Sequence, residues 1–224
     1  MHMIPSSRRV KSATMRFLRF VRDIRATVLI EMAFCIPFLI LVGFGGLEMA
    51  NLTLTNSRIS QIALSAADNA SRIAVGSNLS LPRVREVDIN EVFTGVEEQA
   101  RGLHFKANGR IILSSLERNK DGGQWIHWQR CYGALAKSST YGVEGTGATG
   151  KSFAGMGPAG REVTAVAGTA VMFVEVYYTY QPLAYGNLIG PRTIHTTAAY
   201  NIREARDLTQ VYNPAPTAIK SSCP

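Results

Sequence analysis

The sequence lacks the short patterns that mark common catalytic and metal sites. None of its 224 residues takes part in a G-x-S-x-G, H-E-x-x-H or C-x-x-C pattern. No pair of histidines has the spacing of metal ligands on one element, and only four are present: His2, His104, His127 and His195. We therefore predict that the protein is not an enzyme and holds no metal or cofactor, although a triad assembled from distant residues would leave no such pattern. His127 is expected on a strand surface.

Acidic side chains are scarce at the N-terminus, whereas basic ones are frequent. Residues 1–25 hold a single acid, Asp23, against seven basic side chains: Arg8, Arg9, Lys11, Arg16, Arg19, Arg22 and Arg25. The net charge of +8 is therefore concentrated in one short segment and does not indicate a nucleic-acid-binding face. We predict a basic cytoplasmic leader over residues 1–25 and no nucleic-acid partner.

Charged residues are almost absent from the next stretch, Ala26–Ala50, which is apolar apart from Thr27, Glu31 and Glu48. Its first 22 residues would form a helix of about 33 Å, long enough for the hydrocarbon core of a bilayer. Basic residues beside a span stay in the cytoplasm, so we expect the N-terminus inside and the rest of the chain across the membrane. The alternatives are a buried core helix and a cleaved signal peptide, but the apolar run is long and no A-x-A site follows it.

Two carboxylates within this stretch need an explanation, because a charge in hydrocarbon is costly. Glu48 is near the far end of the stretch, and we expect its side chain to reach the interface. Glu31 lies about one turn inside the cytoplasmic end, where it is either a snorkelling side chain or a charge that finds a cation on another subunit. Cys35 is expected to act as a small apolar residue.

Small residues gather in the second half of the stretch. Gly43, Gly46 and Ala50 follow one another at spacings of three and four, which places them on one helical face. Such a face lets another helix approach closely, although glycine is also common in membrane helices in general. Pro37 has no N–H group, so the carbonyl of Ala33 loses its helical donor and a kink is expected.

The residues from Arg25 to Phe34, followed by Pro37 and Gly43–Glu48, resemble the N-terminus of TadE-like pseudopilins of tight-adherence pili. In that family, basic residues precede a small residue, four further residues and then a glutamate that opens an apolar helix. This sequence departs from the family twice. Ala26 stands where the family usually has glycine, and Met32 replaces an aromatic residue that often follows the glutamate.

The resemblance implies a structural role. Prepilin peptidase would cleave between Ala26 and Thr27, leaving Glu31 as the fifth residue of the mature chain. The protein would be a non-enzymatic minor subunit in assembly or adhesion of a tight-adherence, Flp-type pilus, with other pilin-like subunits and the assembly machinery as partners. It would be stored in the inner membrane with a periplasmic domain, and would either enter the filament or only prime it. The alternative is a membrane-anchored periplasmic enzyme or ligand-binding domain that never joins a pilus.

Apolar residues continue past the span with a helical period. Leu52, Ile59, Ala66 and Ile73 recur every seven residues, which predicts an amphipathic extension of the same helix over residues 51–76. We expect this helix to end near Val75, because a glycine and then a proline follow. We expect the following domain to pack against the apolar face of this helix and bury it.

The rest of the chain indicates a second helix and an antiparallel sheet. A helix over residues 88–101 would be capped by Asp88, with Glu91 completing a capping box. Turns are expected at Asn108-Gly109 and at 121–123, between strands over residues 104–107, 110–117, 125–131, 170–180 and 193–202. We therefore predict an α+β fold, with an extracytoplasmic domain over 77–204 and an irregular C-terminal tail over 205–224. The resemblance further describes this fold as pilin-like.

The segment Gly145–Ser152 matches the phosphate-binding pattern G-x-x-x-x-G-K-[ST] at every defined position. That pattern binds phosphate with backbone N–H groups at a helix N-terminus, so it needs a buried strand before it and a helix after it. Here residues 137–141 are polar, and residues 153–160 are rich in glycine and contain a proline. We predict a flexible loop that binds no nucleotide.

Cysteine is rare, with three in the chain. Cys131 and Cys223 both lie in the part expected to face an oxidising periplasm, where they allow one intrachain disulfide. Two free thiols are the alternative.

Overall fold

A computed structural model describes residues 24–76, 80–183 and 190–224 of the chain. The chain divides into two compact units, one up to Ala50 and one over Asn51–Pro224. The predicted basic leader lies outside the described residues, except for its last two positions.

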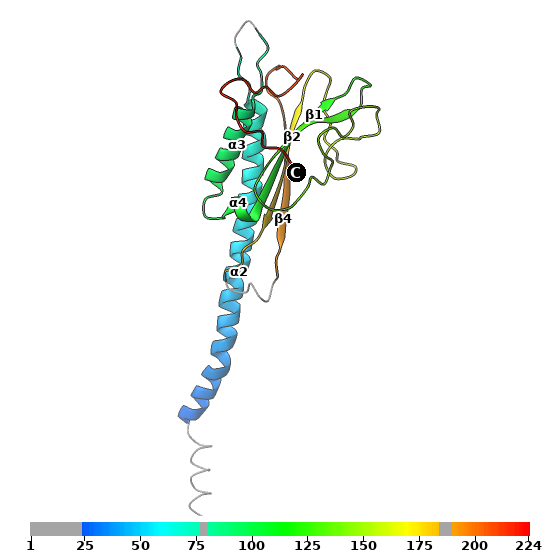
Figure 1. Ribbon diagram of the computed structural model, residues 1–224. Helices are drawn as coiled ribbons and strands as arrows, with labels where there is room; N and C mark the ends of the chain where they lie inside the picture. Colours follow the sequence, from blue (N-terminus) through cyan, green and yellow to red (C-terminus); the bar gives the residue numbers. More distant parts are fainter. Residues whose placement is uncertain (1–23, 77–79, 184–189) are drawn as a thin grey trace, which may run out of the picture. The chain divides into compact units, whose positions relative to one another are not determined.

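One helix of 49 residues, α2, runs over Ile24–Arg72 (Figure 1). Its residues up to Ala50 belong to the first unit and the others to the second. The predicted membrane span and the predicted amphipathic extension are therefore one continuous helix, and Pro37 lies inside it without ending it. The helix ends three residues before the predicted end at Val75. Both backbone polar groups of Val75 instead pair with those of Arg83, at 3.0 and 2.8 Å.

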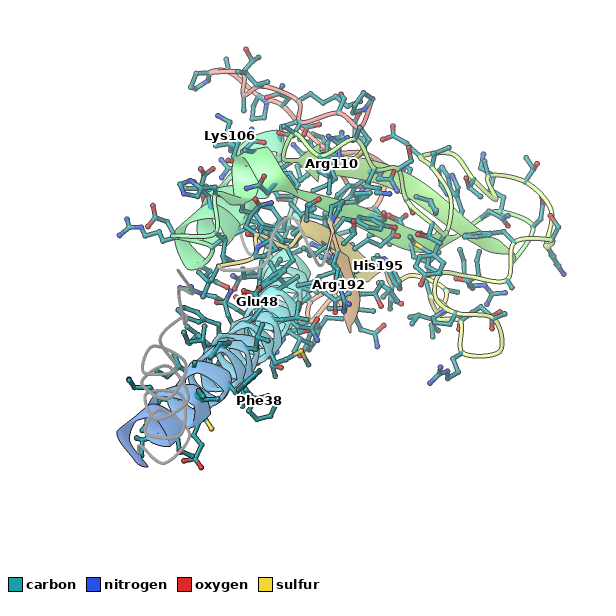
Figure 2. The ribbon with its side chains drawn as sticks, turned by 90° about the horizontal axis from the view of Figure 1, so that it is seen from below. Phe38, Glu48, Lys106, Arg110, Arg192 and His195 are labelled. Atoms are coloured by element: carbon teal, nitrogen blue, oxygen red, sulfur yellow. A yellow bond between two sulfur atoms is a disulfide. The ribbon has the colours of Figure 1, made fainter. Side chains whose placement is uncertain are left out.

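The part of α2 in the first unit is apolar and exposed. Its large side chains from Val28 to Leu47 face outward on every side, and Phe38, which is 66% exposed, projects from the helix in Figure 2. Within the described ranges, α2 is the one helix long and apolar enough to cross a membrane. This exposure argues against the alternative of a buried core helix, because none of the apolar window of α2 is covered.

Glu48 does not behave as predicted. Its exposed fraction is 3%, so its side chain is shielded and does not reach out to an interface. A carboxylate this well buried requires polar partners, and Glu48 takes part in at least one polar or charged interaction.

The second unit contains a four-stranded antiparallel sheet in the order β2-β1-β3-β4. The strands are β1 (Gly109–Arg118), β2 (Gln124–Tyr132), β3 (Val171–Thr179) and β4 (Thr193–Asn201). Four of the five predicted strands are thus confirmed, with bounds that differ by one residue at most ends. The predicted turn at 121–123 connects β1 to β2.

One face of the sheet forms the main core. Aliphatic side chains of β1 and β3, such as Leu113 and Val174, pack there against residues 51–72 of α2 and against α3 (Glu86–Gln99) (Figure 1). The predicted stripe of α2 is buried in this core, and it includes Ile59, Ile62, Ala63, Ala66 and Ala70. Helices therefore cover one face of an antiparallel sheet, and the α+β fold class is confirmed.

The other face of the sheet is covered by irregular chain. Because strand residues alternate, Arg110 and Ile112 of β1 lie on this face, and Ile112 stands opposite Cys131 on one side and Glu175 on the other. Leu135 and Cys223, from the loop after β2 and from the C-terminal segment, pack over them.

The start of α3 differs from its prediction. The helix begins at Glu86, two residues early, and Arg85 occupies the cap position. Asp88 is the third helical residue, and its carboxylate accepts the backbone N–H of Arg85 at 3.0 Å and pairs with the Arg85 guanidinium at 2.6 Å. The reciprocal partner of the cap is therefore Asp88, and Glu91 does not complete a capping box.

The strand predicted over residues 104–107 and the hairpin turn at Asn108-Gly109 are wrong. Phe105–Asn108 form one helical turn, α4, which the chain enters through His104 in the left-handed region with φ 49°. The Phe105 ring is buried and stacks on Tyr178 with 6.3 Å between ring centroids. Burial of this ring therefore outweighs the local turn preference of Asn-Gly.

The C-terminal segment is irregular, as predicted, but it is attached to the second unit at several points. The Tyr212 N–H donates to the carbonyl of Val84, and the Tyr212 carbonyl accepts the N–H of Glu86, both at 2.9 Å. The side-chain amide of Asn90 donates to the carbonyl of Ile219 at 2.8 Å. The segment thus belongs to the folded unit.

Candidate functional site

The residues of the predicted processing site all lie at the start of α2. The backbone of Ala26 and Thr27 is helical, and the Glu31 side chain is exposed. No ion pair within the described part of the chain involves Glu31. Glu31 therefore has no cationic partner among the side chains that the structure describes.

The predicted helix-packing residues share an open surface. Gly43, Gly46 and Ala50 are all exposed. A Cβ atom added at Gly43 or Gly46 would meet nothing within 4 Å, so no described residue covers this face of α2. The face permits close approach of a second helix.

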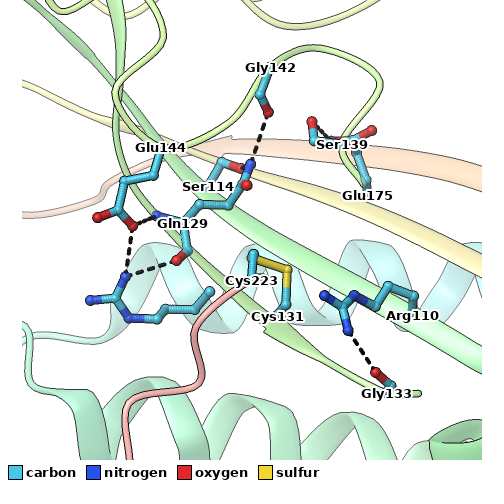
Figure 3. Close-up of a disulfide and its surroundings, with 11 residues drawn as sticks. Arg110, Ser114, Gln129, Cys131, Gly133, Ser139, Gly142, Glu144, Glu175 and Cys223 are labelled. Carbon is cyan, nitrogen blue, oxygen red and sulfur yellow. Dashed lines mark hydrogen bonds and ion pairs between the residues drawn. A yellow bond between two sulfur atoms is a disulfide. The ribbon is translucent and has the colours of Figure 1, made fainter. Parts of the chain in front are cut away.

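Cys131 and Cys223 form a disulfide across 92 residues of sequence (Figure 3). This confirms one of the two predicted alternatives for these thiols, whereas Cys35 is free. The Cys131 N–H also donates to the carbonyl of Ser221 at 2.8 Å. The bridge therefore attaches the C-terminal segment to the second face of the sheet.

The loop Gly145–Ser152 is tied to the β1–β2 turn, so its predicted flexibility is not seen. Asn119 donates to the carbonyls of Gly147 and Gly150, at 2.8 and 2.7 Å. The Gly150 N–H donates to the carboxylate of Asp121 at 2.7 Å, and no helix follows Lys151. An amide that would face a phosphate in a nucleotide site faces a carboxylate here. The sequence pattern therefore lacks the geometry that gives it its function.

A cavity of about 370 Å³ lies beside the disulfide on the second face of the sheet. Strands β1 and β2, the loop after β2 and the C-terminal segment all contribute to its wall, which includes Arg110, Ile112, Gln129, Lys137, Glu144 and Lys220. Sequence reasoning missed this cavity, because it forms only where the C-terminal segment, residues 220–224, packs over β1, β2 and the loop after β2.

Arg110 is the unusual residue of this cavity. It is only 8% exposed, and its Nη1 donates to the carbonyl of Gly133 at 2.9 Å. Its Nε is buried and has no partner among the described residues. Burial lowers the pKa of the Arg110 guanidinium, because no neighbouring carboxylate offsets the loss of water. Figure 3 shows the guanidinium extending toward the disulfide.

Glu175 is fully buried on the same face. Its Oε1 accepts the Thr140 N–H at 2.9 Å and the Tyr177 hydroxyl at 3.1 Å, and its Oε2 accepts the Ser139 hydroxyl. These contacts hold the loop after β2 against β3, and burial raises the pKa of Tyr177 to about 12. The Ser139 hydroxyl donates to Oε2 of this carboxylate, whereas Nε2 of His195 lies 3.8 Å from Oε1. The serine hydroxyl and the imidazole therefore face different oxygens of Glu175.

A second buried arginine is fully paired. Arg130 on β2 donates to both carboxylate oxygens of Glu86, at 2.9 and 2.5 Å, and to Glu144 at 3.1 Å. Both side chains of the Arg130–Glu86 pair are buried, so this ion pair links the sheet to the start of α3. We interpret it as structural.

His127 was predicted to lie on a strand surface, but it is largely covered. Its Nδ1 is 3.0 Å from Oε2 of Glu117, and its ring stacks on Trp125 with centroids 4.0 Å apart. Among the residues that the structure describes, no group of three or more His, Cys, Asp or Glu side chains is arranged to hold a metal ion.

No family model, curated protein or solved structure matches this chain.

Proposed function

We propose that the chain is a non-enzymatic, pilin-like minor subunit of a tight-adherence pilus. The observation that carries the proposal is α2, a single helix whose first part offers an exposed apolar surface and whose second part belongs to the core of an α+β unit. A subunit stored in a bilayer and later packed against other subunits needs such a helix. The resemblance of residues 25–48 to TadE-like pseudopilins supports the same function.

The proposed topology has the N-terminus in the cytoplasm and the second unit in the periplasm. Seven basic residues before the span support this orientation. The Cys131–Cys223 disulfide also supports it, because a structural disulfide persists in an oxidising compartment. A reporter enzyme that works only after export, fused behind Pro224, should be active in the native host. A reporter active only in the cytoplasm would contradict the orientation.

The assembly role is tested by co-purification with pilin-like subunits from the native host. Replacing Gly43 and Gly46 by leucine fills the open face of α2 and should reduce recovery several-fold. The control variant Gly45→Leu adds the same bulk per substitution outside the Gly43–Gly46–Ala50 face and should not reduce recovery. Absence of the wild-type chain from every pilin-containing fraction would rule out the assembly role.

Processing is tested by mass spectrometry of the N-terminus. We expect cleavage between Ala26 and Thr27, and we expect Ala26→Gly to be cleaved at least as completely. Ala26→Leu should block cleavage, because the site requires a small residue. An intact N-terminus in cells with active prepilin peptidase would leave the protein an unprocessed member of the assembly.

The Arg110 cavity favours a second candidate function, a membrane-anchored ligand-binding domain that stays in the bilayer. The two candidates differ in whether the protein co-purifies with pilin-like subunits. A subunit that enters or primes the filament is recovered with them, whereas an anchored binding domain is recovered without them.

A further inference from the structure

We propose that the cavity beside the Cys131–Cys223 disulfide binds a sugar acid, with the Arg110 guanidinium as the main contact to its carboxylate. The proposal goes beyond a role in a pilus and does not depend on it, because it requires only the folded second unit.

The first argument is the difference between two buried arginines on neighbouring strands. Arg130 is 3% exposed and makes a two-point ion pair with Glu86. Arg110 is 8% exposed, yet no ion pair within the described ranges includes it. A buried charge without a counter-charge is costly, and a bound carboxylate would remove that cost.

The second argument is the size of the space. Arg206 also has a buried guanidinium nitrogen without a partner, but the cavity at Arg206 is only about 10 Å³. That volume holds about one water molecule, which is enough to satisfy a single N–H group. The cavity at Arg110 is about 370 Å³, which is within the range of small-ligand sites. The space at Arg110 therefore fits an organic ligand, whereas that at Arg206 does not.

The third argument is the charge and chemistry of the walls. Lys137 and Lys220 are exposed at the cavity, and neither makes an ion pair among the described residues. The one acidic side chain in the wall, Glu144, is already engaged by the backbone N–H of Gln129 and by Arg130. The terminal carboxylate of Pro224 is the second negative group of the wall, against three positive side chains. The cavity thus carries a surplus of positive charge.

The composition of the walls also selects the kind of anion. A planar carboxylate matches a guanidinium edge in a two-point contact, and phosphate is the competing anion that the titration below compares with it. Hydroxyl groups of Ser138 and Ser222 lie in the wall and are suited to the hydroxyls of a sugar, while Ile112 and the disulfide offer an apolar surface to its ring.

The direct test is isothermal titration calorimetry on the full chain in neutral detergent, with the disulfide intact. D-glucuronate should bind at millimolar or lower concentration, and D-glucose, which lacks the carboxylate, at least about tenfold more weakly. Tighter binding of N-acetyl-L-glutamate than of D-glucuronate would overturn the assignment to a sugar. Tighter binding of inorganic phosphate would overturn the assignment to a carboxylate, and no binding of any of these anions would overturn the site.

Substitutions in the cavity wall test where D-glucuronate binds. Arg110→Gln should weaken D-glucuronate binding by about tenfold or more. If that buried substitution prevents folding, the exposed pair Lys137→Ala and Lys220→Ala should together weaken binding by roughly three- to tenfold. The charge-matched pair Lys120→Ala and Lys151→Ala lies outside the cavity wall and should leave the affinity unchanged. An equal loss in both lysine pairs would show a non-specific charge effect and overturn the proposal.

Discussion

The two parts of α2 use apolar side chains in opposite ways. Between Val28 and Leu47 the large side chains are exposed; Phe38, for example, is 66% exposed. Between residues 51 and 72 an apolar stripe is buried, and Ile62 is 1% exposed. Both parts contain isoleucine and leucine, but polar residues are almost absent from the first part and alternate with apolar ones in the second. The first part is apolar on every face and requires an apolar surrounding, whereas the second has one apolar face, which this chain covers with its own sheet.

This comparison leads to a separation of roles that experiments can test. Substitutions in residues 51–224 should change the free energy of unfolding, and substitutions in residues 27–50 should change association in the membrane. The first 50 residues contain no tryptophan or tyrosine, so fluorescence and phenol absorbance report on the second unit alone.

The largest effect on stability should follow removal of the disulfide. Replacing Cys131 and Cys223 by serine opens a loop of 92 residues, which lowers the free energy of unfolding by up to about 4–5 kcal/mol in the chain-entropy model. Guanidinium unfolding of the full chain in neutral detergent, followed by tryptophan fluorescence, measures the change. Cys35→Ser is the matched control in the first unit and should leave the guanidinium concentration at the unfolding midpoint unchanged. Equal midpoints for both variants would contradict the separation of roles.

The next largest effect should come from the buried stripe of α2. Ile62→Ala removes a fully buried side chain and should lower the free energy of unfolding by about 2–5 kcal/mol. Leu64→Ala, two residues away on the same helix, truncates a side chain that is 49% exposed and should cost much less. Phe38→Ala should change the same fluorescence transition by less than about 0.5 kcal/mol. A large effect of Phe38→Ala would show that the first unit stabilises the second.

The two parts of α2 also show how much of the structure can be predicted from the sequence. The span, the amphipathic extension and four strands were predictable, because each has a periodic pattern that extends over many residues. The incorrect predictions concern short segments. At Asn108-Gly109 the predicted hairpin turn is replaced by a helical turn that buries the Phe105 ring. At the start of α3 the cap residue is Arg85 and not the predicted Asp88.

The candidate site was predictable only in part. Cys131 and Cys223 were paired correctly because the two cysteines that follow the apolar helix leave a single intrachain choice. The Arg110 cavity was not predicted, because the partner of a buried arginine is decided by which strands and loops meet around it. The one available signal was an arginine that directly precedes the apolar run 111–113 at the start of β1.

A smaller effect on stability should appear at high pH, and it belongs to the second unit alone. The pKa of Tyr177 is about 12 in the folded protein, above its ordinary value of 10.0. Between these values the folded state binds more protons than the unfolded state, so the free energy of unfolding should fall as pH rises from 10 to 12. Burial also raises the pKa values of Tyr141 and Tyr178, so phenolate absorbance near pH 12 should lose amplitude in Tyr177→Phe and keep it in Tyr200→Phe. An unchanged amplitude in Tyr177→Phe would contradict the assignment.

The smallest effect on unfolding should come from Glu31→Gln, because this side chain is exposed and makes no ion pair within the described part of the chain. Its expected effect is on association. An ionised carboxylate inside hydrocarbon is costly alone, so it should find a cation, and processing would create one at the amine of Thr27 in a neighbouring subunit. Removing the charge should leave membrane insertion intact or improve it.

The charge on Glu31, and not only its shape, should therefore decide how well the chain co-purifies with other pilin-like subunits. Glu31→Gln keeps the shape of the side chain and should reduce recovery several-fold, whereas Glu31→Asp keeps the charge and should restore part of it. Both variants should unfold at the wild-type midpoint, since tryptophan fluorescence reports only on residues beyond Ala50. Unchanged recovery of Glu31→Gln would mean that the carboxylate only snorkels to the membrane surface, and that the first unit associates through its apolar face alone.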